Sequence, residues 1–230
     1  VEIGNPLKRN HFYNSSKDDS YYKIVIDYEQ AIREGRMTKE FIEEMKKKMP
    51  QVLFDIFYGC KFPPAEGLLG WKSEYERFSE IDLKEFQLFT IGTDFAISEK
   101  EEADYSAIDV AGLGKDGKIY NILSEKGKWT PDETFRKIAN YFNFYQKFAL
   151  TICGIEDVGY QRIARDELMR RFGISPYLIK RTTDKRARVL MIQPYFQNSQ
   201  IFFSKNDGDL INQLRNFGNI DEDDLVDAFE

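Results

Sequence analysis

The chain has 230 residues with 42% hydrophobic and 15% aromatic content, which suffices for a real core and excludes a disordered protein. Its formal net charge of −6 argues mildly against a nucleic-acid partner, and no apolar run approaches the roughly 18 residues of a membrane span. The single histidine, His11, excludes most zinc sites and the usual serine or cysteine triads. Any bound metal should therefore be held by oxygen atoms, as Mg²⁺ and Mn²⁺ are.

The N-terminal part of the chain predicts a small unit of strands and helices. Residues 1–6 and 21–27 are typical of short strands, because apolar residues there stand next to turn-forming ones. Thr38 is placed to cap a charged helix that Pro50 ends. Residues 51–62 predict a second, more apolar helix with a short extension. We therefore expect a small helical and strand-containing appendage in front of the main fold.

A change of pattern near residue 86 divides the chain. Residues 73–85 are polar and irregular, and alternating strand and helix patterns begin immediately after them. We therefore predict two domains, an N-terminal one over residues 1–85 and a larger one over residues 86–230. Because the chain opens at Val1 inside an apolar pattern, we also expect it to be a piece of a longer protein.

The larger domain is predicted to alternate strands and helices. Its predicted strands are residues 86–96, 105–114, 118–127, 149–157, 175–181 and 200–205. Its predicted helices are residues 130–148, 159–173, 184–194 and 209–218, with one more beginning in 221–230. An Asp-Gly turn joins the second and third strands into a hairpin. This order predicts an α/β fold whose mixed sheet has three antiparallel strands followed by parallel strand–helix units, with helices on both faces.

Two acidic residues stand at the ends of strands that the pattern buries. Asp94 follows a strand that is apolar on both faces, and Glu156 follows another buried strand. Burying a lone carboxylate is costly unless it is paired or binds a cation. If the two strands are parallel neighbours, both carboxylates emerge at the same sheet edge, where open α/β sheets bind ligands. Taken alone, either residue could instead be a helix cap or a surface acid.

The acidic tail supplies a third group of carboxylates. Asp223, Asp224 and Asp227 can share one face of a helix, because Asp227 follows the other two by three and four positions. Such a group could also be the solvated start of an ordinary helix. The apolar residues of the tail are spaced for packing against another surface: Leu225, Val226, Ala228 and Phe229. Packing would bring at least one of the aspartates close to the sheet edge.

Together, these acids could hold two divalent cations. Two ions roughly 3.5–4 Å apart activate a water and stabilise the leaving oxygen in phosphodiester hydrolysis, and Asp94 would bridge both. Asp104, just before the second strand, is placed to add an outer contact, although it could equally be an ordinary turn acid.

A basic stretch follows the fourth strand. Nine basic residues and only three acids lie between Gly159 and Arg188, in a chain whose overall charge is negative. Phosphate contacts need a local basic surface, so the stretch is a candidate DNA interface, although such residues also form solvated helix faces. The candidate DNA-binding residues are Arg162, Arg165, Lys180, Arg181, Lys185, Arg186 and Arg188.

These segments resemble one known family. The C-terminal nuclease domain of the large terminase subunit of tailed bacteriophages has segments similar, in order and spacing, to GTDFA, ADYSAIDVAG, KDGKIYNI, ICGIEDVGYQR, TDKRARVLMIQPYF, QIFF and DEDDLVDAFE. The resemblance covers residues 86–230 and implies a ribonuclease H-like fold, related to Holliday-junction resolvases. Upstream, the end of the family's packaging ATPase domain is similar to IGNPLKRNHFYNSS, and the connection between its two domains resembles the helical segment that follows.

The resemblance also implies roles for single residues. The family's catalytic aspartate falls on Asp94, its second acid on Glu156, and its paired acids on Asp223 and Asp224. The other matches are a further acid of the last helix, a recurrent acid of the first loop and a basic residue near the site: Asp227, Asp104 and Lys185. The resemblance thus implies four catalytic acids, which also bind metal together with the further acid of the last helix. ATPase activity is not expected from this chain, because the sequence contains no G-x-x-x-x-G-K-[ST] loop.

The resemblance implies a metal-dependent endonuclease that cuts concatemeric viral double-stranded DNA during genome packaging, with two Mg²⁺ or Mn²⁺ ions and low sequence specificity. It further implies the portal protein and the small terminase subunit as partners, and the cytoplasm of an infected bacterium as the location. Nothing in the sequence resembles a signal peptide, so secretion is not expected. Two alternatives stay open. One is a non-catalytic DNA- or procapsid-docking module, and the other is a phosphotransferase of the actin and sugar-kinase type, which would need glycine-rich phosphate loops.

Overall fold

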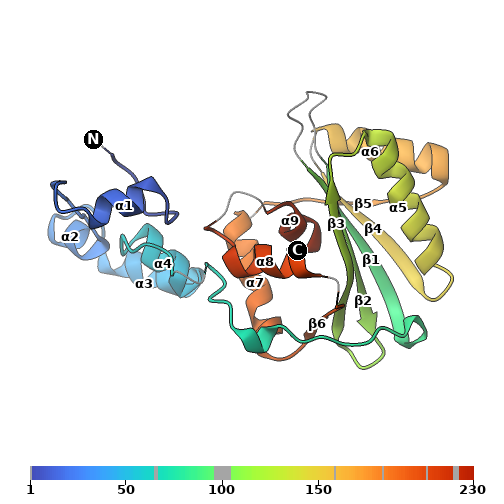
Figure 1. The fold of residues 1–230 in the computed structure, drawn as a ribbon. Helices are drawn as coiled ribbons and strands as arrows, with labels where there is room; N and C mark the ends of the chain where they lie inside the picture. The colour runs from blue at the N-terminus through green and yellow to red at the C-terminus, as the bar shows by residue number, and fades with distance from the viewer. Residues whose placement is uncertain are drawn as a thin grey trace.

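The computed structural model describes residues 2–64, 67–95, 105–157, 159–182, 184–205, 207–219 and 223–230. Its centre is a six-stranded sheet in the order β5-β4-β1-β2-β3-β6 (Figure 1). The strands are β1 (Phe86–Asp94), β2 (Ser106–Gly114), β3 (Ile119–Gly127), β4 (Leu150–Glu156), β5 (Tyr177–Ile179) and β6 (Ile201–Phe203). The helices around it are α5 (Pro131–Tyr145), α6 (Gly159–Phe172), α7 (Lys185–Gln197), α8 (Gly208–Asn216) and α9 (Asp224–Phe229).

The sheet mixes antiparallel and parallel neighbours. β1, β2 and β3 are antiparallel, whereas β4 runs parallel to β1, β5 to β4 and β6 to β3. The Asp-Gly turn between β2 and β3 is present, with Gly117 at φ 79° and its amide donating to the carbonyl of Gly114. The predicted α/β fold, with three antiparallel strands followed by parallel units, is therefore confirmed.

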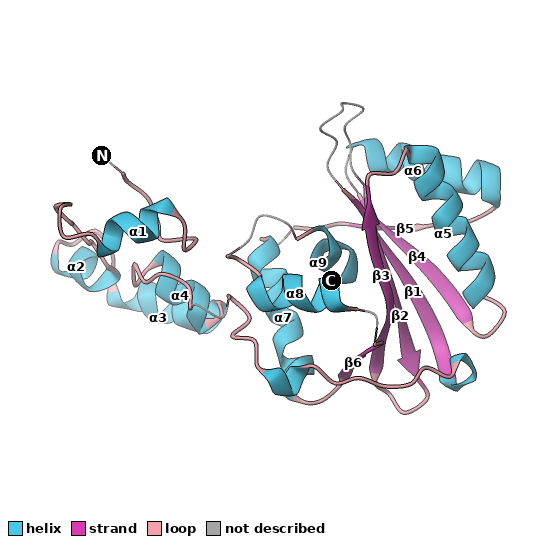
Figure 2. Cartoon of the chain, viewed as in Figure 1, coloured by secondary structure: helices cyan, strands magenta, loops and turns pink. Residues whose placement is uncertain are grey.

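Helices cover both faces of the sheet, α5 and α6 on one and α7, α8 and α9 on the other (Figure 2). Side chains alternate along a strand, and β2 supplies both cores, whereas the core residues of β1 lie on the α5 side. Phe89 and Ile91 are buried with Ile138 of α5, whereas Ala107 of β2 belongs to the other core, with Leu225 of α9. The first strand contacts α5 on one face and α9 on the other, so it is covered on both sides, as predicted.

Helix ends follow the capping signals of the sequence. Thr130 accepts the amide of Glu133, whose carboxylate accepts the amide of Thr130 in return, so α5 begins with a capping box. Gly173, at φ 68°, follows the last residue of α6. The helix α7 differs from the prediction, because it runs past Pro194 to Gln197. A proline this close to the helix end removes one hydrogen bond without ending the last turn.

Residues 2–64 of the described chain contain four helices, α1 (His11–Lys17), α2 (Tyr28–Arg33), α3 (Lys39–Lys48) and α4 (Gln51–Phe57). Thr38 caps α3 as predicted, by accepting the amide of Phe41. The predicted strands are wrong, because no described residue of 1–6 or 21–27 belongs to a strand. A strand needs a neighbour for its backbone hydrogen bonds. Residues 21–27 instead lie at the surface, where Tyr22 is 93% exposed.

A connecting segment, residues 71–85, leads into β1 and contains two short 3₁₀ helices, η1 (Ser73–Tyr75) and η2 (Leu83–Glu85). The start of this segment packs on the α7 side of the sheet, where the Trp71 ring lies 5.1 Å from that of Phe196. The division into domains at residue 85 stays a prediction. No helix within the described ranges combines the length and the hydropathy that crossing a bilayer requires.

Candidate active site

The strands β1 and β4 end side by side at one edge of the sheet. They are parallel neighbours, as predicted, and their register pairs Thr93 with Ile155. Asp94 and Glu156 follow these residues and are the last of their strands, so the two carboxylates emerge at the same edge. β5 extends this edge, where Ile179 pairs with Glu156.

A glycine in β1 lets α9 pack directly on the sheet. Gly92 and Asp94 are two positions apart, so they face the same side of the strand. A Cβ atom added to Gly92 would lie 1.9 Å from the carbonyl oxygen of Ala228, so the helix backbone touches the strand. Leu225 and Val226 of α9 are fully buried in the core on this face. The helix therefore brings its aspartates to the strand end that carries Asp94.

The carboxyl group of Asp94 lies among other carboxylates. Burial is the main cause that raises its pKa to about 7, and the charges of Asp227 and Asp224 add to the effect. Lys185 and Arg181 oppose this rise without cancelling it. Burial also raises the pKa of Asp227. Such a group of like charges in a partly buried place favours the binding of a proton or a cation.

Lys185, the first residue of α7, contacts two of the aspartates. Its Nζ lies 2.8 Å from Oδ2 of Asp223 and also pairs with the carboxylate of Asp227. Burial would lower the pKa of Lys185, but the hydrogen bonds to these two carboxylates outweigh it, and the pKa is raised. The structure thus joins Lys185 to the acidic group that the resemblance implied.

The other basic residues fall into two groups. Arg181 and Arg188 are mostly buried and pair with Glu230 of the tail. Arg162 is exposed and lies 2.6 Å from a carboxylate oxygen of Asp157. The remaining candidates for DNA contact lie at the surface or are partly exposed: Arg165, Lys180 and Arg186.

Asp104 lies outside the described residues. Of the remaining candidates, Asp94 is close enough to Asp224 and Asp227 for their charges to raise its pKa. Asp223 is joined to this group through Lys185, and Glu156 ends the neighbouring strand. Within the described ranges, no three acidic, histidine or cysteine side chains are already arranged to hold an ion. The donor set still fits Mg²⁺ or Mn²⁺, because carboxylate oxygens are their preferred ligands and the charges of Asp227 and Asp224 act on the buried Asp94, where a cation would compensate them.

Asp109 is a buried carboxylate that sequence reasoning did not single out. It pairs with Gly92 across the sheet and is 2% exposed. Its Oδ1 accepts hydrogen bonds from the hydroxyl of Ser124, at 2.7 Å, and from the side-chain amide of Asn121. Burial raises the pKa of Asp109 to about 7 against these two donors, and Asp207 adds to the rise. Only its place inside an apolar strand could have drawn attention to it, and its satisfied hydrogen bonds indicate a structural role.

Replacing Asp109 with asparagine should stabilise the protein at alkaline pH. The folded state raises this pKa above its ordinary value near 4, so the stability that the protonated carboxyl provides is lost as the pH rises towards about 7. Asparagine keeps the acceptor without the charge. We expect a gain in the free energy of unfolding of ~2–4 kcal/mol at pH 8, shrinking towards pH 4, in urea titrations. The control Ser124→Ala removes a donor and should lower stability at pH 8. An Asp109→Asn protein less stable than wild type at pH 8 would contradict this account.

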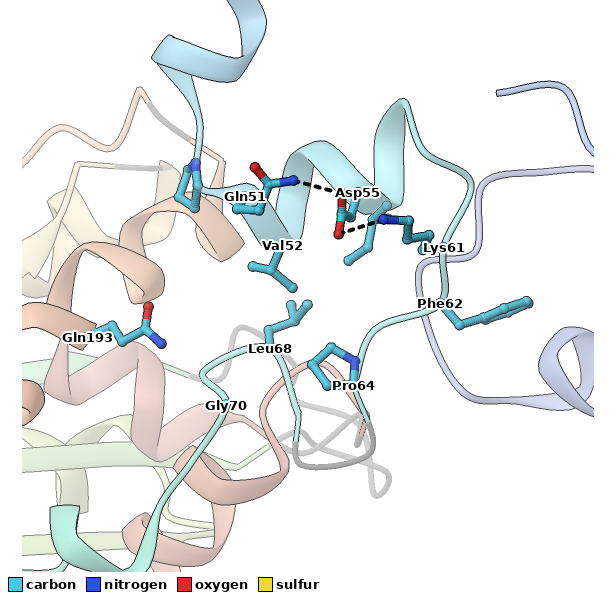
Figure 3. A pocket seen from close by; sticks show the side chains of 11 residues that line it. Gln51, Val52, Asp55, Lys61, Phe62, Pro64, Leu68, Gly70 and Gln193 are labelled. Carbon is cyan, nitrogen blue, oxygen red and sulfur yellow. Dashed lines mark hydrogen bonds and ion pairs between the residues drawn. The ribbon is translucent and has the colours of Figure 1, made fainter. Parts of the chain in front are cut away.

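A cavity of about 530 Å³ lies away from the acidic group, between α4, the segment after it and α7 (Figure 3). Val52 of α4 and Leu68 face each other across it, and Gln193 of α7 borders it. The carboxylate that borders the cavity, Asp55, is already paired with Lys61 at 3.2 Å. This lining is mostly apolar and carries none of the candidate site residues, so the cavity is separate from the acidic site.

No protein-family model and no curated protein matches this chain. Among solved structures, the large terminase nuclease from the thermophilic phage G20c with bound cobalt has a TM-score of 0.51 and 14% identity, covering 72% of this chain and 95% of that one. The terminase nuclease domain of human cytomegalovirus, manganese-soaked and inhibitor-bound, has a TM-score of 0.46 and 14% identity, covering 66% and 86%. The yeast mitochondrial Holliday junction resolvase has a TM-score of 0.35 and 15% identity, covering 61% and 75%.

Sequence identities of 14–15% show a similarity of fold only. The mixed six-stranded sheet between two helical layers is a ribonuclease H-like α/β fold. Within this class, the fold is similar to that of the large terminase nuclease from phage G20c, as the sequence resemblance implied.

Proposed function

We propose that this chain is a metal-dependent endonuclease that cuts concatemeric viral double-stranded DNA during genome packaging. The observation that carries the proposal is the group of carboxylates at the sheet edge, where burial and the charges of Asp227 and Asp224 of α9 raise the pKa of Asp94 to about 7. A buried group of like charges is costly to build and is typical of a site that binds cations. The fold supports the same reading, because the phage G20c nuclease that it resembles was solved with bound cobalt.

The acids have distinct places in this proposal. Asp94 and Glu156 would hold metal from the ends of two parallel strands, and Asp223, Asp224 and Asp227 would do so from α9. When bound, two Mg²⁺ or Mn²⁺ ions would supply Lewis-acid activation of a water and stabilise charge on the leaving oxygen. Lys185 already neutralises part of the aspartate charge and would keep the α9 carboxylates close to Asp94.

The DNA backbone would lie against the basic residues that remain accessible. Lys180 and Arg162 are exposed near the sheet edge, and Arg186 is partly exposed at the start of α7. Contacts of this kind bind phosphates and carry little sequence information, so cleavage should have low sequence specificity.

In the packaging motor, the portal protein and the small terminase subunit would be partners, and cleavage would take place in the cytoplasm of an infected bacterium. Residues 1–85 would then be the end of the packaging ATPase domain and its connection, without ATPase activity of their own.

One observation favours a second candidate, a non-catalytic DNA- or procapsid-docking module. Lys185 already pairs with Asp223 and Asp227, so these carboxylates could be structural. A phosphotransferase is less well supported, because Gly114, the last residue of β2, and Gly117 belong to a hairpin turn, in which the Gly114 amide donates to the carbonyl of Lys118. A phosphate loop would instead leave such amides free for the ligand.

Plasmid cleavage tests the proposed function. Because the acids need cations to act, we expect supercoiled plasmid to be cut with Mn²⁺ or Mg²⁺ and to stay intact with EDTA. Glu156→Gln, which removes one carboxylate at the strand ends, should lower the cleavage rate at least ~100-fold. The exposed acid Glu74 offers a control, because Glu74→Gln changes the same charge far from the sheet edge and should cut like wild type. Cleavage that persists in EDTA, or that Glu156→Gln leaves unchanged, would refute the proposal.

A further inference from the structure

The helix α9 depends on its surroundings for its position. Leu225 and Val226 hold one face of it in the core, and Gly92 lets its backbone touch β1. These contacts fix how close the helix lies to the sheet, but apolar contacts are not directional and leave its rotation and its C-terminal turn to be fixed by polar ones.

Two arginines from outside the sheet make those polar contacts. Arg181, two residues beyond β5, donates from NH2 to the carbonyl oxygen of Asp227 at 2.9 Å, and its NH1 lies 2.7 Å from Oε1 of Glu230. Arg188 of α7 donates to the same carboxylate, with Nε at 3.0 Å and NH2 at 2.6 Å from Oε1. A carbonyl of the last helical turn and the residue after the helix are therefore both held by guanidinium groups, which match carboxylate geometry.

The burial of these groups separates them from the other basic residues. The side chain of Glu230 is 4% exposed, and those of Arg181 and Arg188 are 14% and 20% exposed. Removing one partner from such a pair leaves the other charge buried and uncompensated, which is strongly unfavourable. An arginine that binds DNA phosphates needs an exposed guanidinium group. Among the basic candidates, Lys180 is exposed, whereas Arg181 and Arg188 are not.

We propose that Arg181 and Arg188 are positioning residues, which hold the C-terminal turn of α9 through Glu230 and the Asp227 carbonyl and so keep the aspartates of α9 facing Asp94. The basic stretch of the sequence predicts both arginines as DNA contacts. The inference rests on the proposed function, because the site that the arginines hold in place is the metal site. Arg188 acts through the helix that carries the metal-binding acids, whereas Arg181 also lies 3.7 Å from the carboxylate of Asp227.

Mn²⁺ titration calorimetry without DNA tests this, because two explanations predict opposite signs. If Arg188 acted only as a nearby positive charge, Arg188→Gln would tighten Mn²⁺ binding. If it positions α9, Arg188→Gln should weaken Mn²⁺ binding about tenfold to a hundredfold, as the loss of a residue that orients metal ligands does. Arg186→Gln is the matched control, because it removes the same charge one turn or less away on α7, and Mn²⁺ affinity should be unchanged or slightly higher. Equal or tighter binding by Arg188→Gln overturns the inference.

Two further measurements identify the contact and separate the two proposals. Arg188→Lys keeps the charge and should recover part of the Mn²⁺ affinity, and Glu230→Gln, which removes the carboxylate that both arginines hold, should weaken Mn²⁺ binding at least as much as Arg188→Gln does. If wild type takes up no Mn²⁺, the proposed function fails, and hydrogen exchange of the metal-free protein decides the inference. Amides of 225–229 should then exchange at least ~10-fold faster in Arg188→Gln than in wild type or Arg186→Gln. Unchanged protection of α9 would overturn the positioning role.

Discussion

Replacing Asp94 with asparagine should abolish metal-dependent DNA cleavage and, at the same time, stabilise the metal-free protein. Asp94 is the acid on which the charges of Asp224 and Asp227 act, so it is the best placed to share a cation with them. Metal-ion catalysis is worth several kcal/mol, so losing this ligand should slow plasmid cleavage at least about a thousandfold.

The gain in stability follows from the direction of the pKa shift. Burial, with the charges of Asp227 and Asp224, raises the pKa of Asp94 to about 7, whereas the unfolded chain has a value near 4. The folded protein therefore binds this proton more tightly than the unfolded chain, and stability declines as the pH rises from about 4 to about 7. Asparagine removes the charge, so in EDTA at pH 8 we expect ~2–4 kcal/mol more stability and a Tm higher by ~5–10 °C.

Thermal unfolding with EDTA and with Mn²⁺ measures both effects. Wild type should gain stability from Mn²⁺ by binding it in the folded state, whereas the variant should not. Mn²⁺ should therefore reduce or reverse the difference in Tm between the variant and wild type. Asp116→Asn is the control, because hydrogen bonds from Lys118 and Tyr120 outweigh burial and lower the pKa of Asp116, so its loss should not stabilise the protein. A variant that is less stable than wild type in EDTA would show that Asp94 is not repelled in the folded state. Retained cleavage would place the chemistry elsewhere.

The sheet could be predicted because its signals are local. The strand alternation and the Asp-Gly turn each need only neighbouring residues, and both are present in the structure. The strand predicted at 21–27 is wrong for the opposite reason. Its β-branched and aromatic residues favour a strand, but strand pairing requires a partner that the sequence pattern does not reveal.

The residues of the site divide in the same way into those that local patterns could place and those whose partners lie far away in the sequence. Asp94 and Glu156 could be placed at one edge, because parallel order and strand ends follow from the alternation of elements. The partner of Arg188 could not, because Glu230 lies 42 residues further along the chain, and a basic stretch looks the same whether it faces DNA or its own helix. Gly92 carried a usable signal, since a lone glycine inside a strand indicates a close backbone approach.

Replacing Gly92 with alanine should displace α9 and with it the aspartates. The added Cβ atom would lie 1.9 Å from the carbonyl oxygen of Ala228, which belongs to the helix backbone and cannot rotate away as a side chain would. The helix must therefore move off the strand, exposing part of the core that Leu225 and Val226 fill. We expect a loss of ~3 kcal/mol or more in the free energy of unfolding, at the upper end of what overpacked cores cost.

The same displacement should weaken Mn²⁺ binding more than tenfold at a temperature where the variant is still folded, because metal ligands tolerate little misplacement. Urea titration and Mn²⁺ calorimetry on one preparation measure the two effects together. Gly208→Ala is the matched control, because a Cβ atom there meets no atom within 4 Å, and stability and Mn²⁺ affinity should both stay near wild type. If Gly92→Ala unfolds and binds Mn²⁺ as wild type does, α9 does not rest on β1. The acids of the tail would then have no fixed place beside Asp94, and the metal site would have to be built from the strand ends alone.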